Sequence, residues 1–79
     1  MITSYLKAAL RHARYEKIED KSYIGTIKGF RGVIANDNSL EDCRDHLEEV
    51  LEEWLMLRIS RHLPIPEVDG LRLRIKKMA

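Results

Sequence analysis

The sequence has few of the residues and patterns that mark several common protein classes. Cys43 is the single cysteine, so no disulfide can form within the chain and nothing indicates an oxidising compartment. No apolar run is long enough to cross a bilayer, and no segment resembles a signal peptide. We therefore expect a cytoplasmic protein without membrane association. Its 79 residues make one small domain, a size at which one core is marginally stable and self-association is a common remedy.

Charge is nearly balanced in total but unevenly distributed along the chain. The net charge of +1 favours no class of partner. Basic residues gather in residues 1–17 and in the tail. Between residues 37 and 53 the single base is Arg44, and the acids are Asp37, Glu41, Asp42, Asp45, Glu48, Glu49, Glu52 and Glu53. An acidic middle of this kind can bind a basic partner protein or a neighbouring copy in an oligomer.

Hydrophobic periodicity predicts one α+β domain over residues 1–79, with the order α-β-β-β-α-β. The expected elements are a helix in residues 1–14, a three-strand meander in 15–35, a main helix in 39–62 and a last strand in 71–77. In the meander, Tyr23–Ile27 is the best strand, and Gly25 is expected to be a bulge or a point of close approach. An antiparallel sheet packed against one long helix would give a two-layer sandwich.

The main helix has the clearest pattern. Ser39 and Asp42 form a capping box at its start, and Pro64 follows its end. An apolar stripe runs through Leu40, Cys43, Leu47, Val50, Trp54 and Leu57, and we expect Leu47, Val50, Leu51 and Trp54 to lie in the core. Further apolar residues, Leu55, Met56 and Ile59, widen the stripe. Because one sheet face does not need so much apolar surface, a dimer or partner contact is expected.

The glycines between Gly29 and Gly32 raise the question of a phosphate-binding loop. Such loops place glycine directly before a helix, where backbone N–H groups and the helix dipole meet the anion. Here a strand-like segment and a polar run come between, and the helix start is crowded by Asp37, Glu41 and Asp42. We interpret Gly29–Gly32 as a turn between strands.

No set of residues predicts a metal site, a cofactor or catalysis. Cys43 and His46 share a helical face, but His12 and His62 lie in other elements and no second cysteine exists. No nucleophile-elbow pattern is present, so we expect no enzymatic activity. The alternating basic residues of the tail, Arg72, Arg74 and Lys76, could lie along nucleic acid. An ordinary exposed strand face, or an edge strand whose charges discourage stray pairing, is the favoured explanation, and direct DNA binding is not expected without an additional domain.

The order of these features from Tyr23 to Gly70 resembles the HicB-like antitoxin family. In that family a glycine turn leads to a short strand, a D-[ST]-L-E-E-type helix start, a long amphipathic helix and an "IP" segment. The matching residues here are Gly32, Ser39-Leu40-Glu41-Asp42, Leu47, Trp54 and Leu63-Pro64-Ile65-Pro66. The chain departs from the family at the turn, where Lys28 and Arg31 replace prolines.

The resemblance implies a degenerate ribonuclease-H-like domain without nuclease activity. Its members bind and neutralise HicA, a small basic toxin that cleaves messenger RNA, by covering the toxin's active site. Many members also carry a DNA-binding domain; this sequence ends at Ala79, so operator binding is not expected. An orphan oligomeric scaffold or regulatory protein, a dimer or tetramer with no toxin partner, is the alternative. A residual metal-dependent nuclease is disfavoured because Tyr23–Lys28 and Val33–Ala35 contain no carboxylate.

Partner binding is assigned to the acidic part of the main helix. Acidic side chains speed the approach of a basic partner, and an apolar residue beside them helps to hold it. The predicted partner-binding residues are Glu48, Glu49, Glu52, Glu53 and Met56.

Overall fold

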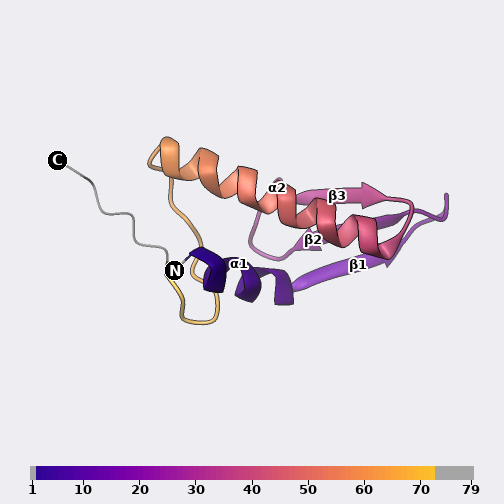
Figure 1. Ribbon diagram of the computed structural model, residues 1–79, viewed down its shortest axis with the longest axis horizontal. Helices are drawn as coiled ribbons and strands as arrows, with labels where there is room; N and C mark the ends of the chain where they lie inside the picture. Colours follow the sequence, from indigo (N-terminus) through magenta and orange to yellow (C-terminus); the bar gives the residue numbers. More distant parts are fainter. Residues whose placement is uncertain (1, 73–79) are drawn as a thin grey trace.

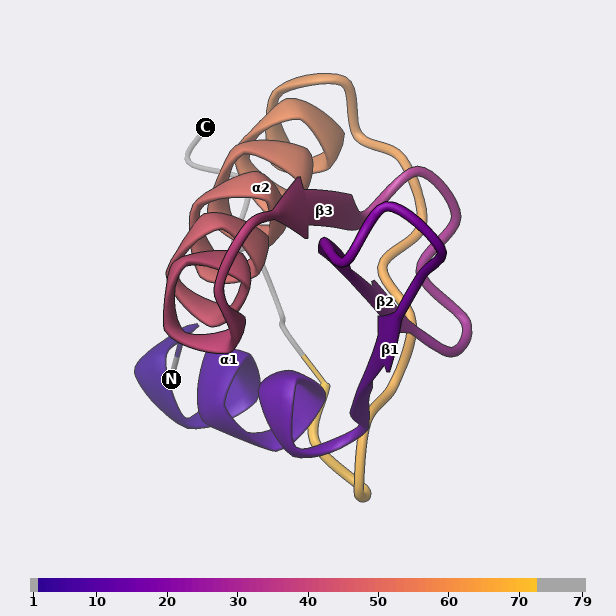
Figure 2. The same ribbon diagram turned by 90° about the vertical axis from the view of Figure 1, so that its right-hand side faces the viewer.

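The structure, a computed structural model, describes residues 2–72. Its elements are α1 (Ile2–Arg11), β1 (Ala13–Lys17), β2 (Tyr23–Ile27), β3 (Ile34–Asp37) and α2 (Leu40–Ser60). The strands form one antiparallel sheet in the order β1-β2-β3. In Figure 1, α2 runs over the sheet and continues past it, beside α1. Figure 2 shows the two helices and the sheet from a second side. The packing of α2 against β2 and β3 confirms the predicted α+β fold with one long helix.

The core is formed by side chains from both helices, from β2 and β3, from the turn between those strands and from the segment after α2. Its buried members are Tyr5, Ala8, Ala9, Ile27, Phe30, Val33, Ala35, Cys43, Leu47, Leu51, Leu55 and Val68. Gly29 and Gly32 have φ angles of 87° and 88°, which confirms the predicted turn. The turn inserts Phe30 into the core, where its ring lies 5.1 Å from that of Trp54.

The apolar stripe of α2 differs in part from the predicted one. Leu47 and Leu51 are buried as expected, and Val50 and Trp54 are partly buried against the core. Leu55, predicted to widen the exposed surface, is buried, whereas Leu57 is 48% exposed. The buried residues Cys43, Leu47, Leu51 and Leu55 recur every four residues. Since a helix has 3.6 residues per turn, a row with four-residue spacing winds slowly around α2. Leu57 lies outside this row and is therefore exposed.

The N-terminal helix is shorter than predicted. It ends at Arg11, where the His12 N–H donates to the Ala9 carbonyl at 3.0 Å, and β1 starts at Ala13. Ala13 pairs with Ile27 in the sheet, so strand pairing overrides the helical preference of this alanine.

The third strand extends further than predicted, to Asp37 instead of Ala35. The Asn36 side chain donates hydrogen bonds to the Tyr23 carbonyl and to the Ser22 hydroxyl, both at 2.9 Å. These bonds hold the polar residues against β2. Asn36 and Asp37, whose polar side chains are typical of a loop, therefore form the end of β3.

After α2 the chain passes back over the core as a segment without helix or strand. The Tyr5 hydroxyl donates to the Pro66 carbonyl, Val68 is buried, and Val68 forms an isolated bridge with Leu71. Leu71 and Arg72 are therefore not part of the sheet, contrary to the predicted last strand at 71–77; residues 73–77 lie outside the described part of the chain. Neither described helix is long and apolar enough to cross a membrane.

Candidate functional site

The outward side of α2 carries the predicted partner-binding residues. Because the buried row occupies the opposite side of the helix, Glu48, Glu49, Glu52 and Glu53 are all exposed. We call these four residues the acidic face. None of them forms an ion pair with another described residue. Their charge is thus not neutralised by ion pairing within residues 2–72.

Helical geometry divides the acidic face into two rows. Glu48 and Glu52 are one turn apart, and each borders a hollow between α2 and the N-terminal part of the chain. Glu49 and Glu53 form the other row and border neither hollow. Of the predicted acids, Glu48 and Glu52 therefore lie next to these two hollows.

The first of these hollows, which we call the apolar hollow, lies between α1 and the second half of α2. Its volume is about 330 Å³, and it is lined by Thr3, Leu6, Glu52, Leu55, Met56 and Ile59. Met56 is 69% exposed at its edge. Methionine is flexible and polarizable, so it adapts to apolar side chains of different shape. Glu52 places a negative charge beside this apolar surface.

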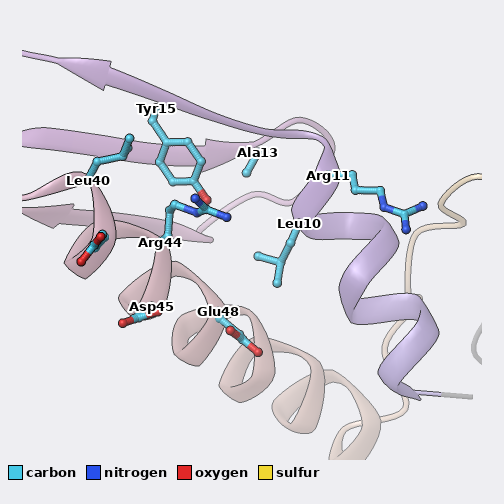
Figure 3. Close-up of a pocket in the computed structure, with 9 residues that line it drawn as sticks. Leu10, Arg11, Ala13, Tyr15, Leu40, Arg44, Asp45 and Glu48 are labelled. Carbon is cyan, nitrogen blue, oxygen red and sulfur yellow. The ribbon is translucent and has the colours of Figure 1, made fainter.

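The second hollow, which we call the strand-edge hollow, lies where α1 ends and β1 begins (Figure 3). Its volume is about 610 Å³, and it is lined by Leu10, Arg11, Ala13, Tyr15, Leu40, Glu41, Arg44, Asp45 and Glu48. Figure 3 shows Leu10 pointing toward α2 and the Arg44 side chain lying toward Tyr15. Burial raises the pKa of Tyr15, while the positive charge of Arg44 opposes that rise. Two guanidinium groups and three carboxylates give this hollow mixed charge.

Cys43 is a core thiol, as the apolar stripe predicts. Its Sγ lies 3.6 Å from the carbonyl oxygens of Tyr23 and Ala35, and its side chain is buried. Burial, with a smaller contribution from the nearby Asp37 charge, raises the pKa of the thiol. Because the thiolate is the reactive form, Cys43 is poorly suited to act as a nucleophile.

Two of the three histidines, His12 and His46, each contact an aspartate of another segment. His46 Nδ1 lies 2.8 Å from Asp37 Oδ2, and His12 Nε2 lies 2.8 Å from Asp69 Oδ1. Within residues 2–72, no group of three or more histidine, cysteine, aspartate or glutamate side chains could hold a metal ion.

Sequence reasoning missed the residues that α1 contributes to the apolar hollow, Thr3 and Leu6. Their three-residue spacing does place them on one helical face. The spacing does not show which element this face packs against. The packing of α1 on α2 in the structure provides that information.

Comparisons with known proteins agree with this fold. The UPF0150-like family model matches residues 4–66. The crystal structure of TTHA0281 from Thermus thermophilus is similar to this chain, with a TM-score of 0.90 and 36% sequence identity. The similarity covers 96% of this chain and 95% of that chain. No curated protein matches the sequence.

Proposed function

The chain belongs to the UPF0150-like family, and on this premise we propose that it is a HicB-like antitoxin module that binds and neutralises a HicA-type toxin. The UPF0150-like family is often associated with HicB-like antitoxins. In this proposal the chain covers the active site of a small basic enzyme that cleaves messenger RNA in the cytoplasm. The chain itself needs no catalytic residue and no cofactor, because inhibition is by occlusion.

The observation that carries the proposal is the acidic face next to the apolar hollow. Exposed glutamates with no ion-pair partner among the described residues attract a basic protein and speed its encounter. Met56 and the hollow beside it offer the apolar burial that slows dissociation once the partner is seated. A basic enzyme with an apolar residue near its active site fits both features.

The test is the association rate of the full chain with the small basic protein encoded beside its gene, in a catalytically inactive form. Glu49→Lys/Glu52→Lys should slow association at least about tenfold and flatten its salt dependence. Glu19→Lys/Glu67→Lys makes the same change of net charge away from the acidic face and serves as the control. Equal rates for the two double variants would refute the acidic face as the docking surface, and failure to inhibit RNA cleavage would refute the antitoxin role.

A second function is favoured by the apolar side chains on the described surface, which include Ile34 (54% exposed) and Met56. We propose as the alternative an orphan oligomeric scaffold or regulator with no toxin partner. It requires a stable dimer or tetramer of the purified chain, measurable by light scattering. A chain that stays monomeric at all concentrations would eliminate it.

A further inference from the structure

The outer edge of β1 is open. In the order β1-β2-β3, β1 is an edge strand, and no other segment within residues 2–72 forms backbone hydrogen bonds to its outer side. In Figure 1, α1 and β1 follow one another along the molecule instead of lying side by side, so α1 leaves that edge uncovered. Folded proteins commonly blunt such edges with a proline, a bulge or charged side chains. β1 has no proline, and its register with β2 is continuous from Ala13 to Lys17, so it has no bulge. Its charged side chains, Arg14, Glu16 and Lys17, are of both signs, so they can attract a suitably placed second strand as well as repel one.

The hydrogen bonds of the β1–β2 hairpin determine which backbone groups point to the open edge. The Ile18 N–H donates to the Ser22 carbonyl at 2.9 Å, so these two facing residues occupy a hydrogen-bonded position of the ladder, while the Ser22 N–H donates to Asp20 Oδ1 in the turn. Hydrogen-bonded and non-hydrogen-bonded pairs alternate along an antiparallel ladder. The even-numbered residues of β1 therefore bond to β2. The backbone N–H and C=O groups of the odd-numbered residues point outward: Ala13, Tyr15 and Lys17.

We propose that β1 of a second copy of this chain occupies this edge, antiparallel and centred on Tyr15, about a twofold axis. In this register Tyr15 faces Tyr15 of the second copy, and Ala13 faces Lys17 of the second copy. All of these residues have outward-pointing backbone groups, so the two strands can exchange hydrogen bonds at each facing pair. The two sheets then join into one. The proposal is independent of the antitoxin role.

Charge complementarity selects this partner and this register. Arg14 and Glu16 are exposed, lie on one face of β1, and form no ion pair with another described residue. Centring on Tyr15 places Arg14 of each copy opposite Glu16 of the other, twice by symmetry. Opposite charges at facing positions stabilise a strand pair. Centring on Arg14 or on Glu16 instead would place like charges directly opposite each other, so the neighbouring registers are disfavoured.

The other face of the strand pair meets the strand-edge hollow. Ala13 and Tyr15 line it, and Glu41, Asp45 and Glu48 also lie on its wall. Lys17 of the second copy, opposite Ala13, extends toward these carboxylates from the open side. The second copy thus supplies a cation to a hollow with more carboxylates than guanidinium groups. Pairing of the two strands also covers Tyr15, which is partly exposed in the single chain.

The experiment is sedimentation equilibrium of the full chain and of charge variants. In the Arg14→Glu variant, an acid at position 14 of each copy faces the acid Glu16 of the other copy. In the Glu16→Arg variant, two bases face each other in the same way, so two copies of either variant repel each other. We expect each to weaken the dimer at least about tenfold. An equimolar mixture of the two variants restores both opposite-charge pairs and should dimerise at least as tightly as the unmodified chain. Glu19→Arg, an equal charge change in the exposed turn after β1, is the control.

Amide exchange then locates the interface. Dimerisation should protect the amides of Tyr15 and Lys17 in a concentration-dependent way. The amides of Arg14 and Glu16 are already bonded to β2 and should not change. A chain that is monomeric at every concentration overturns the proposal. So does a dimer that both single variants leave intact, because its interface must then lie elsewhere. Circular dichroism confirms that the variants are folded, as expected for two exposed side chains.

Discussion

Gly25 shows how one residue sets the spacing between the sheet and α2. A Cβ atom at this position would lie 2.9 Å from Tyr15 Cε1 and 3.2 Å from Cys43 Sγ. The strand therefore approaches both side chains more closely than any other residue would permit. The sequence predicted a bulge or a close approach at Gly25, and the unbroken register of β2 with β1 and β3 identifies the close approach.

We predict that Gly25→Ala lowers the free energy of unfolding by about 1–3 kcal/mol, because added volume in a packed core forces neighbours out of position. Urea unfolding of the full chain measures this change. Cys43→Ala removes the sulfur atom, so the cost of Gly25→Ala should be smaller in that background. Strictly additive effects of the two substitutions would contradict the proposed contact with Cys43.

At the scale of elements, α2 begins where its capping residue predicts. Ser39 is in the extended conformation, and its hydroxyl accepts a hydrogen bond from the Asp42 N–H at 3.1 Å. Glu41 and Asp42 lie in the first turn, where the helix dipole favours negative charge. The start of the main helix is thus encoded by a few adjacent residues, which is why sequence alone located it.

We predict that Ser39→Ala destabilises the protein by about 1 kcal/mol, the usual cost of losing an N-cap side chain. Ser60→Ala is the control at the other end of the same helix. The Ser60 hydroxyl donates to the Leu57 carbonyl and satisfies no free N–H, so its loss should cost less than about 0.5 kcal/mol. Thermal unfolding monitored by circular dichroism compares the two variants, and equal shifts would argue against a capping role for Ser39.

Other element boundaries depend on long-range contacts that no local pattern contains. Ala13 and Arg14 continue a helical pattern, yet they pair with Ile27 and Thr26 on a distant strand. Asn36 reads as a loop residue, yet its side chain bonds across to β2. In each case tertiary pairing decides between two locally acceptable conformations. Local signals therefore predict the elements themselves better than their ends.

The same contrast holds for the candidate site at the scale of the whole molecule. Sequence periodicity placed Glu48, Glu49, Glu52 and Glu53 on the solvent side of α2, where the structure has them. It did not distinguish Glu52, which borders the apolar hollow, from Glu53, which does not. That distinction depends on where α1 packs. The pattern of one helix was thus enough to predict which acids are exposed. To predict which of them border a hollow, the packing of α1 on α2 had to be known.

Three ionisable side chains that the fold buries fully or in part, one each from α1, β1 and α2, link stability to pH. Burial raises the pKa of Tyr5, Tyr15 and Cys43 above their ordinary values of 10.0, 10.0 and 9.0. Each group is neutral when protonated, and the folded protein holds its proton more tightly than the unfolded chain does. Their contribution to stability is therefore fully present below pH 9.0 and decreases at higher pH.

We predict that the free energy of unfolding is nearly constant between about pH 7 and pH 8.5 and falls steadily above about pH 9. Urea titrations at a series of pH values measure the profile. Cys43→Ala lowers stability at every pH because it leaves a cavity, but it should also remove the earliest part of the alkaline fall. The phenol groups keep their effect in that variant, so the fall should begin nearer pH 10. An identical pH profile in both proteins would mean that the thiol does not contribute to this linkage.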